Sequence, residues 1–102
     1  MGEFVRVARA GDIAPGEARA VESAGRRIAL FNVDGTLHAI DDTCTHQGGP
    51  LSEGMVDGTE VTCPWHGAVF DVTNGAVLSA PAPRDVAFYR VRVNGEDIEV
   101  EI

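Results

Sequence analysis

The sequence lacks three features that would place it in common functional classes. It contains no run of about 18 apolar residues, so it predicts no membrane-spanning helix. Its first ten residues alternate charged and apolar side chains without the apolar core of a secretory signal, and we therefore expect a cytoplasmic location. Its densest basic pair is Arg26-Arg27, and a cluster this short predicts no binding to nucleic acid.

Cysteine is also scarce, because the chain has only Cys44 and Cys63. Two cysteines allow one structural disulfide, but a reducing cytoplasm disfavours it. Each cysteine is followed two or three residues later by a histidine, which offers both thiols a role as metal ligands. The third histidine, His38, lies outside both of these pairs and is expected to be an ordinary surface or hydrogen-bonded residue.

The remaining composition is that of a small globular protein. The 102 residues, 44% of them apolar, predict one domain that spans residues 1–102. Sixteen acidic residues against eight basic ones give a formal net charge of −8. This acidity either keeps the protein soluble or steers it toward a basic partner surface, and the charge alone does not separate the two.

Short alternating or β-branched runs separated by turns dominate the chain, and no long helical periodicity is present. Asp34-Gly35 is typical of a tight hairpin turn. The expected strands are 3–7, 17–21, 27–33, 36–40, 55–56, 60–62, 68–72, 76–78, 88–93 and 97–102. About nine to ten short strands with regular turns predict an all-β sandwich or barrel.

Two irregular stretches interrupt this pattern and hold both cysteines. They contain Cys44-Thr45-His46 and Cys63-Pro64-Trp65-His66, with sixteen residues between His46 and Cys63. Loops at the tips of neighbouring hairpins would bring one thiolate and one imidazole each to a common site. One zinc ion accepts two cysteines and two histidines, but such sites usually begin with two closely spaced cysteines. Two irons bridged by sulfides accept the same four side chains, with each loop spanning the pair.

The segments Cys44-Thr45-His46-Gln47-Gly48-Gly49-Pro50-Leu51 and Cys63-Pro64-Trp65-His66-Gly67 resemble the two cluster-binding boxes of Rieske proteins. The resemblance implies one [2Fe–2S] cluster, with Cys44 and Cys63 on one iron and His46 and His66 on the other. It also implies a Rieske-like antiparallel β-sandwich with a cluster-binding subdomain at about 42–82, formed by two hairpin loops. In this family the loop after the second box lies over the cluster, which assigns Pro81 and Pro83 to its cover.

The resemblance also indicates the branch of the family. Respiratory-chain Rieske proteins carry an additional cysteine in each box, and a serine and a tyrosine where this chain has Ala68 and Phe70. Fewer hydroxyl donors near the cluster leave its reduced form less stabilised. We therefore expect a reduction potential at the low end of the Rieske range, nearer roughly −150 mV than +300 mV.

The function implied by the resemblance is that of a Rieske-type ferredoxin. Such a protein carries one electron from a flavoprotein reductase to the terminal oxygenase of a bacterial aromatic-ring hydroxylating dioxygenase system, as a monomer and without catalysis of its own. The alternative within the family is a small Rieske subunit of an assimilatory nitrite reductase or another multisubunit oxidoreductase. The alternative outside the family is a binding module stabilised by zinc.

Overall fold

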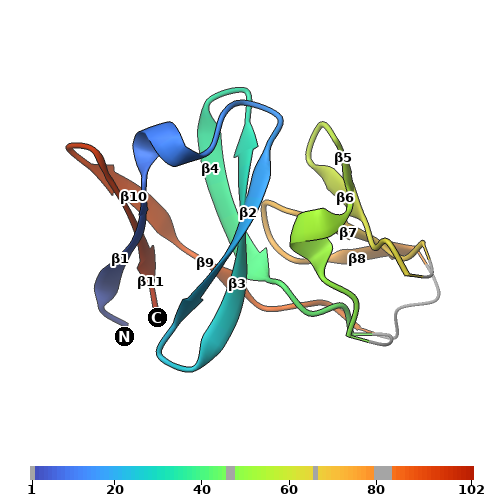
Figure 1. Ribbon diagram of the computed structural model, residues 1–102. Helices are drawn as coiled ribbons and strands as arrows, with labels where there is room; N and C mark the ends of the chain where they lie inside the picture. The colour runs from blue at the N-terminus through green and yellow to red at the C-terminus, as the bar shows by residue number, and fades with distance from the viewer. Residues whose placement is uncertain (1, 46–47, 66, 80–83) are drawn as a thin grey trace.

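A computed structural model describes residues 2–45, 48–65, 67–79 and 84–102. The described residues form eleven strands in three antiparallel sheets, with two short 3-10 helices, as Figure 1 shows. The all-β prediction is confirmed. In these parts of the chain no helix is long and apolar enough to cross a membrane.

The first and last strands of the chain share one sheet at one end of the molecule, where both termini lie (Figure 1). Its order is β1-β11-β10, and its strands are β1 (Phe4–Arg9), β11 (Asp97–Glu101) and β10 (Val91–Asn94). A 3-10 helix, η1 (Ala10–Asp12), follows β1. Arg90 separates β10 from the two-residue strand β9 (Phe88–Tyr89), which belongs to the next sheet.

The second sheet forms the middle of the molecule. Its order is β2-β3-β4-β9, and its longer strands are β2 (Ala18–Ser23), β3 (Arg26–Val33) and β4 (Thr36–Asp41). Asp34 and Gly35 connect β3 to β4 with φ angles of 52° and 92°, and the Asn32 side chain accepts a hydrogen bond from the Gly35 amide at 2.8 Å. The predicted Asp34-Gly35 hairpin turn is therefore confirmed.

Strand β3 is buried on both faces, which explains the layered arrangement. Ile28, Ala29, Leu30 and Phe31 each have 0% exposed surface. Successive side chains of a strand point to opposite faces. Ile28 and Leu30 pack into a core that includes residues of the terminal sheet, whereas Ala29 and Phe31 pack into a second core that includes both cysteines. The middle sheet thus supports the cysteine-containing end from behind.

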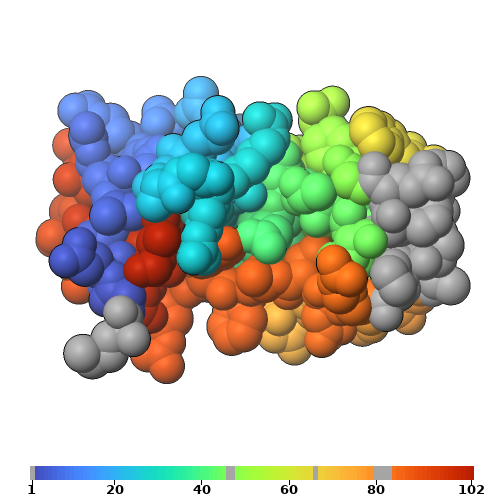
Figure 2. Space-filling model, turned by 90° about the horizontal axis from the view of Figure 1, so that it is seen from below, coloured from blue at the N-terminus to red at the C-terminus, as the bar shows by residue number. Residues whose placement is uncertain are grey.

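The third sheet carries this cysteine-containing end. Its order is β5-β6-β7-β8, and its strands are β5 (Met55–Asp57), β6 (Glu60–Thr62), β7 (Val69–Asp71) and β8 (Val77–Ser79). A second 3-10 helix, η2 (Leu51–Glu53), precedes β5. Figure 2 shows the molecule elongated, with the terminal strands at one end and the β5–β6 hairpin toward the other.

One predicted strand is wrong. The alternation over residues 88–93 predicted a single strand, but the structure divides it into β9 and β10. Strand β9 pairs with β4, and β10 pairs with β11 in a different sheet. The chain crosses between two sheets at Arg90, and this raises the number of strands from the expected nine or ten to eleven.

Candidate metal centre

The first cysteine loop closes upon Cys44 through its backbone. The Cys44 amide donates a hydrogen bond to the Gly49 carbonyl at 2.9 Å, and the Gly48 amide donates to the Cys44 carbonyl at 2.9 Å. Gly48 has a φ of 78°, a backbone conformation that residues with a Cβ atom rarely adopt. Two backbone hydrogen bonds thus close the first loop at its base.

The second cysteine loop closes upon Cys63 in the same way. The Cys63 amide donates to the Ala68 carbonyl at 2.7 Å, and the Gly67 amide donates to the Cys63 carbonyl at 3.1 Å. Gly67 has a φ of 79°, almost equal to that of Gly48. The two loops differ in sequence, yet each uses a glycine four residues after its cysteine to reverse the chain.

The two loops meet. A Cβ atom placed on Gly49 of the first loop would lie 2.7 Å from Cys63 Sγ and 3.1 Å from the ring of Trp65 in the second. Cys44 and Cys63 are both 3% exposed and belong to the same buried cluster, which also contains Leu51 and Phe70. Cys63 has a free thiol, so the two cysteines are not bonded to each other. The sequence prediction that both cysteines approach one site is supported to this extent.

The structure describes only some of the residues that the sequence assigned to the site. His46 and His66, the adjacent Gln47, and the covering residues Pro81 and Pro83 lie outside the described residues. Among the residues that are described, no three histidine, cysteine or acidic side chains form a group that could hold a metal ion. The four-ligand set therefore stays a prediction.

A surface groove beside Cys63 has a volume of about 550 Å³. Its lining residues are Glu53, Gly54, Met55, Thr62, Cys63, Pro64 and Gly67. Met55 is 78% exposed and Trp65 is 55% exposed, which excludes Trp65 from the core. Sequence reasoning did not single out Met55 or Glu53, because neither belongs to a recognisable motif.

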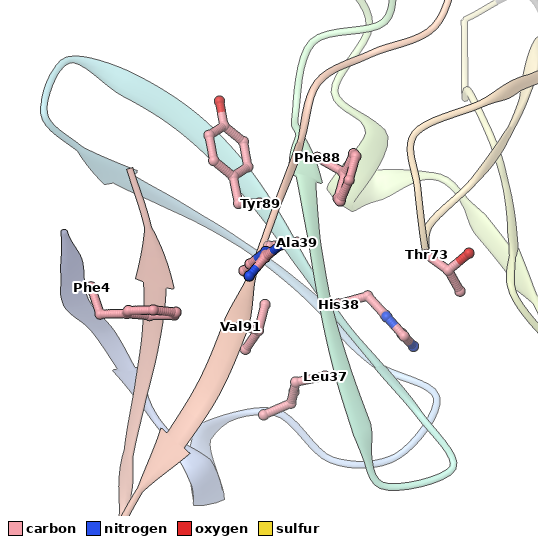
Figure 3. Close-up of a pocket in the computed structure, with 9 residues that line it drawn as sticks. Phe4, Leu37, His38, Ala39, Thr73, Phe88, Tyr89 and Val91 are labelled. Carbon is pink, nitrogen blue, oxygen red and sulfur yellow. The ribbon is translucent and has the colours of Figure 1, made fainter. Parts of the chain in front are cut away.

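His38 lies elsewhere, as expected. It lines a separate groove of about 370 Å³ together with residues of β1, β4, β9 and β10. Figure 3 shows His38 projecting from β4 toward the segment that carries Thr73. Neither cysteine lines this groove, so His38 is not part of the cysteine site.

Tyr89, at the junction of the middle and terminal sheets, has a pKa raised above its ordinary value of 10.0. Burial is the main cause, and the hydrogen bond from its hydroxyl to the Asp41 carboxylate adds to it, while Arg26 over the ring opposes it. Because the folded state favours the neutral phenol, this contribution to stability is complete below the unfolded pKa of about 10. It is lost as the pH rises through the higher pKa of the folded protein.

Tyr89 is the only tyrosine of the chain, so its titration can be followed directly. We expect the ultraviolet absorbance of tyrosinate to develop with a midpoint above pH 10 in the folded protein. The Tyr89→Phe variant supplies the blank, and Asp41→Asn should lower the midpoint because it removes the neighbouring negative charge. A wild-type midpoint at or below 10 would contradict the assigned environment.

The fold and the site together define a class of protein. Its members are all-β, and two similarly closed cysteine loops meet at one end of their layered sheets. The family description "Rieske [2Fe-2S] domain" matches residues 3–90. The chain belongs to the Rieske [2Fe-2S] family.

Individual relatives agree with this assignment. The chain is 33% identical over 91 residues to the ferredoxin component of a naphthalene 1,2-dioxygenase system of Pseudomonas aeruginosa, and the match covers 89% of this chain and 88% of the relative. The solved ferredoxin of carbazole 1,9a-dioxygenase from Nocardioides aromaticivorans IC177 superposes with a TM-score of 0.91 at 31% identity over 95% of each chain. A structure described as the complex of reduced oxygenase and oxidized ferredoxin in carbazole 1,9a-dioxygenase contains a chain with a TM-score of 0.89 at 34% identity, covering 96% of this chain and 92% of that one.

These comparisons confirm the resemblance, the Rieske fold and the cofactor, which is a [2Fe–2S] cluster of the Rieske type. The described half of the site fits such a group. Two buried thiols converge from two loops, and the absence of a side chain at Gly49 leaves the backbone of one loop against the sulfur of the other. Thiolates of this kind bind the iron of iron–sulfur clusters.

Proposed function

We propose that this chain is a one-electron carrier that passes electrons from a flavoprotein reductase to the terminal oxygenase of an aromatic-ring hydroxylating dioxygenase system. The observation that carries the proposal is the contact of two closed cysteine loops at Gly49, in a chain that matches dioxygenase ferredoxins over nearly its whole length. Cys44, His46, Cys63 and His66 hold the cluster. The protein works as a cytoplasmic monomer, as one Rieske domain over residues 1–102 with its cluster-binding subdomain at about 42–82.

The ligand set explains why the protein is a carrier and has no catalytic centre of its own. When bound, the cluster supplies reversible one-electron chemistry. Four protein ligands complete the coordination of both irons and leave no position for a substrate, in contrast to catalytic metal sites, which keep one position open. The chain's task is then to hold the thiols, limit the access of water and present this end to partners.

The surface around the second loop suits such a partner. Among the described residues, three of the five large apolar side chains that are clearly exposed lie on this half of the molecule: Met55, Trp65 and Leu78. The residues from 28 to 83 contain no lysine or arginine but seven acidic residues, so they carry −7 of the formal net charge of −8. A partner surface with apolar side chains ringed by basic ones complements this end.

The proposal is tested by analysis of the purified protein. We expect two irons and two acid-labile sulfides per chain, a reddish-brown colour, and reduction by one electron with a midpoint potential nearer roughly −150 mV than +300 mV. Cys44→Ser and Cys63→Ser should each abolish most of the visible absorbance, because each removes a thiolate ligand. A matched His38→Ala variant should keep the absorbance, since His38 lines the other groove.

Three results would contradict parts of the proposal. A colourless protein with one zinc per chain would exclude the cluster. Full visible absorbance in Cys44→Ser would exclude the ligand assignment. A large subunit that co-purifies in stable complex would favour the small-subunit alternative over a free carrier, and gel filtration of the holoprotein checks the monomer directly.

A further inference from the structure

The two cysteine loops are anchored differently at their bases. The second loop lies at the tip of a regular hairpin, in which Thr62 pairs with Val69 and the ladder continues through Val61 and Phe70. The first loop leaves the end of β4 and returns to η2, and the only strand-like pairing described for it is the isolated bridge between Thr43 and Pro50. Ordinary strand pairing therefore holds the second loop but contributes little to the first.

Asp42 lies at the base of the first loop, where each of its backbone and side-chain polar atoms makes a hydrogen bond. Its carboxylate accepts a hydrogen bond from the Ser52 amide at 2.7 Å and another from Arg27 Nε at 2.7 Å. Its carbonyl accepts from the Leu51 amide at 2.6 Å, and its amide donates to the Arg27 carbonyl at 3.0 Å. One residue thus joins the start of the loop, the end of the loop and strand β3.

Burying the Asp42 carboxylate carries a cost in free energy, because a charged group is removed from water. Asp42 has 0% exposed surface, whereas the Arg27 side chain that it pairs with is half exposed. Burying an ion pair usually contributes less stability than a well-packed apolar side chain of the same size. An apolar side chain, however, cannot accept hydrogen bonds from two different segments at once. The arrangement is therefore better explained by the geometry that it fixes than by stability alone.

We propose that Asp42 is a positioning residue for the cluster: it fixes the base of the first loop and thereby the placement of Cys44 relative to Cys63. The inference rests on the cysteine ligands of the proposed function. Its consequence is that the retention of the cluster and the environment of its irons depend on the Asp42 hydrogen bonds beyond their effect on overall stability. Arg27 acts through Asp42, since its guanidinium bonds to one of the two carboxylate oxygens.

The test uses the holoprotein and three variants at these positions. Asp42→Ala removes both side-chain bonds, Asp42→Asn keeps an acceptor for the Ser52 amide, and Arg27→Gln removes only the guanidinium. The measurements are the rate of iron release to a ferrous chelator, the visible circular dichroism and midpoint potential of the cluster, and the thermal unfolding midpoint. The matched control is Glu99→Gln, which breaks a similar pair, with Arg92 Nε at 2.6 Å, far along the chain in the terminal sheet.

We expect iron release to accelerate at least about tenfold in Asp42→Ala, a factor equivalent to about 1.4 kcal/mol. Asp42→Asn and Arg27→Gln should lie between this variant and the wild type, with altered visible circular dichroism. Glu99→Gln should keep the wild-type spectrum and release rate even if its unfolding midpoint falls.

The proposal is overturned if Asp42→Asn and Arg27→Gln keep the wild-type spectrum, potential and release rate, or if iron release in all variants simply follows the unfolding midpoint. If Asp42→Ala does not fold, the two milder variants still decide the question. A failure of the proposed function is distinguishable, because the wild-type protein itself would then contain no iron–sulfur cluster.

Discussion

The Gly49→Ala variant is expected to lose most of its cluster. The added Cβ would lie 2.7 Å from Cys63 Sγ, closer than nonbonded atoms approach, and 3.1 Å from the Trp65 ring, which is a tight contact. Cys63 cannot yield easily, because it is buried and both its amide and its carbonyl are hydrogen-bonded within the loop, whereas the exposed Trp65 ring can shift. Overpacking of this kind costs about 1–3 kcal/mol. At this position the cost falls directly on a predicted ligand, so iron and sulfide per chain should drop well below the wild-type content.

Two other glycines separate the possible causes of such a loss. Gly11→Ala places its Cβ in open space on an ordinary backbone and should be neutral. Gly67→Ala also meets no atom of the described residues, but its φ of 79° imposes a backbone penalty of about 1–2 kcal/mol. Reduced thermal stability with retained iron is therefore expected for Gly67→Ala. A Gly49→Ala protein with wild-type iron content, spectrum and unfolding midpoint would show that the two loops are not in this contact.

Sequence patterns predicted those parts of the fold that local rules determine. The turn residues Asp34-Gly35 and the apolar run from Ile28 to Phe31 are local features, and the hairpin turn and the strand predicted from them are both present. The division of residues 88–93 was not predictable in this way, because alternation is continuous through Arg90. The break arises from a choice of partners, β4 for one half and β11 for the other, and that choice depends on the three-dimensional arrangement.

The site shows the same limit. The cysteine and histidine spacing carried the prediction of the cofactor, which the family comparison confirms. Asp42 was not singled out, because a charged residue in an irregular segment is typical of a solvated loop. In the folded protein Asp42 is buried and accepts hydrogen bonds from Arg27, fifteen residues earlier, and from Ser52, ten residues later. No local sequence pattern predicts these contacts. The residues predicted to bind the cluster follow a sequence motif. A supporting residue such as Asp42 is recognised only from the folded structure.

The direction in which the molecule meets its partner should depend on where its acidic residues lie. Residues 28–83 contain seven acidic residues and no basic one, and among the described residues only Asp42 of these seven forms an ion pair, with Arg27. Such an asymmetric distribution orients a charged protein during diffusional encounter as well as attracting it. A basic partner is then approached with the cluster end first, which shortens the path for the electron.

Neutralising three exposed acidic residues at this end should therefore slow electron transfer strongly. In the variant Glu53→Gln, Asp57→Asn, Glu60→Gln we expect the second-order rate of reduction of a basic c-type cytochrome to fall about tenfold to a hundredfold at low ionic strength. The difference should shrink as added salt reduces the screening length to about 8 Å or less. Stopped-flow mixing of the reduced protein with the oxidised cytochrome measures both effects.

The control changes the net charge equally near the terminal sheet, through Glu3→Gln, Asp12→Asn and Glu96→Gln, three exposed residues away from the cysteine loops. If net charge alone governed the encounter, both triple variants would slow the reaction to the same extent, and the orienting role of the cluster end would be wrong. At the same low ionic strength we expect the control to lose less than about threefold, because its charges lie farther from the contact and the Coulomb energy falls with distance. The same comparison repeated with the natural reductase and oxygenase would show whether both partners use this end.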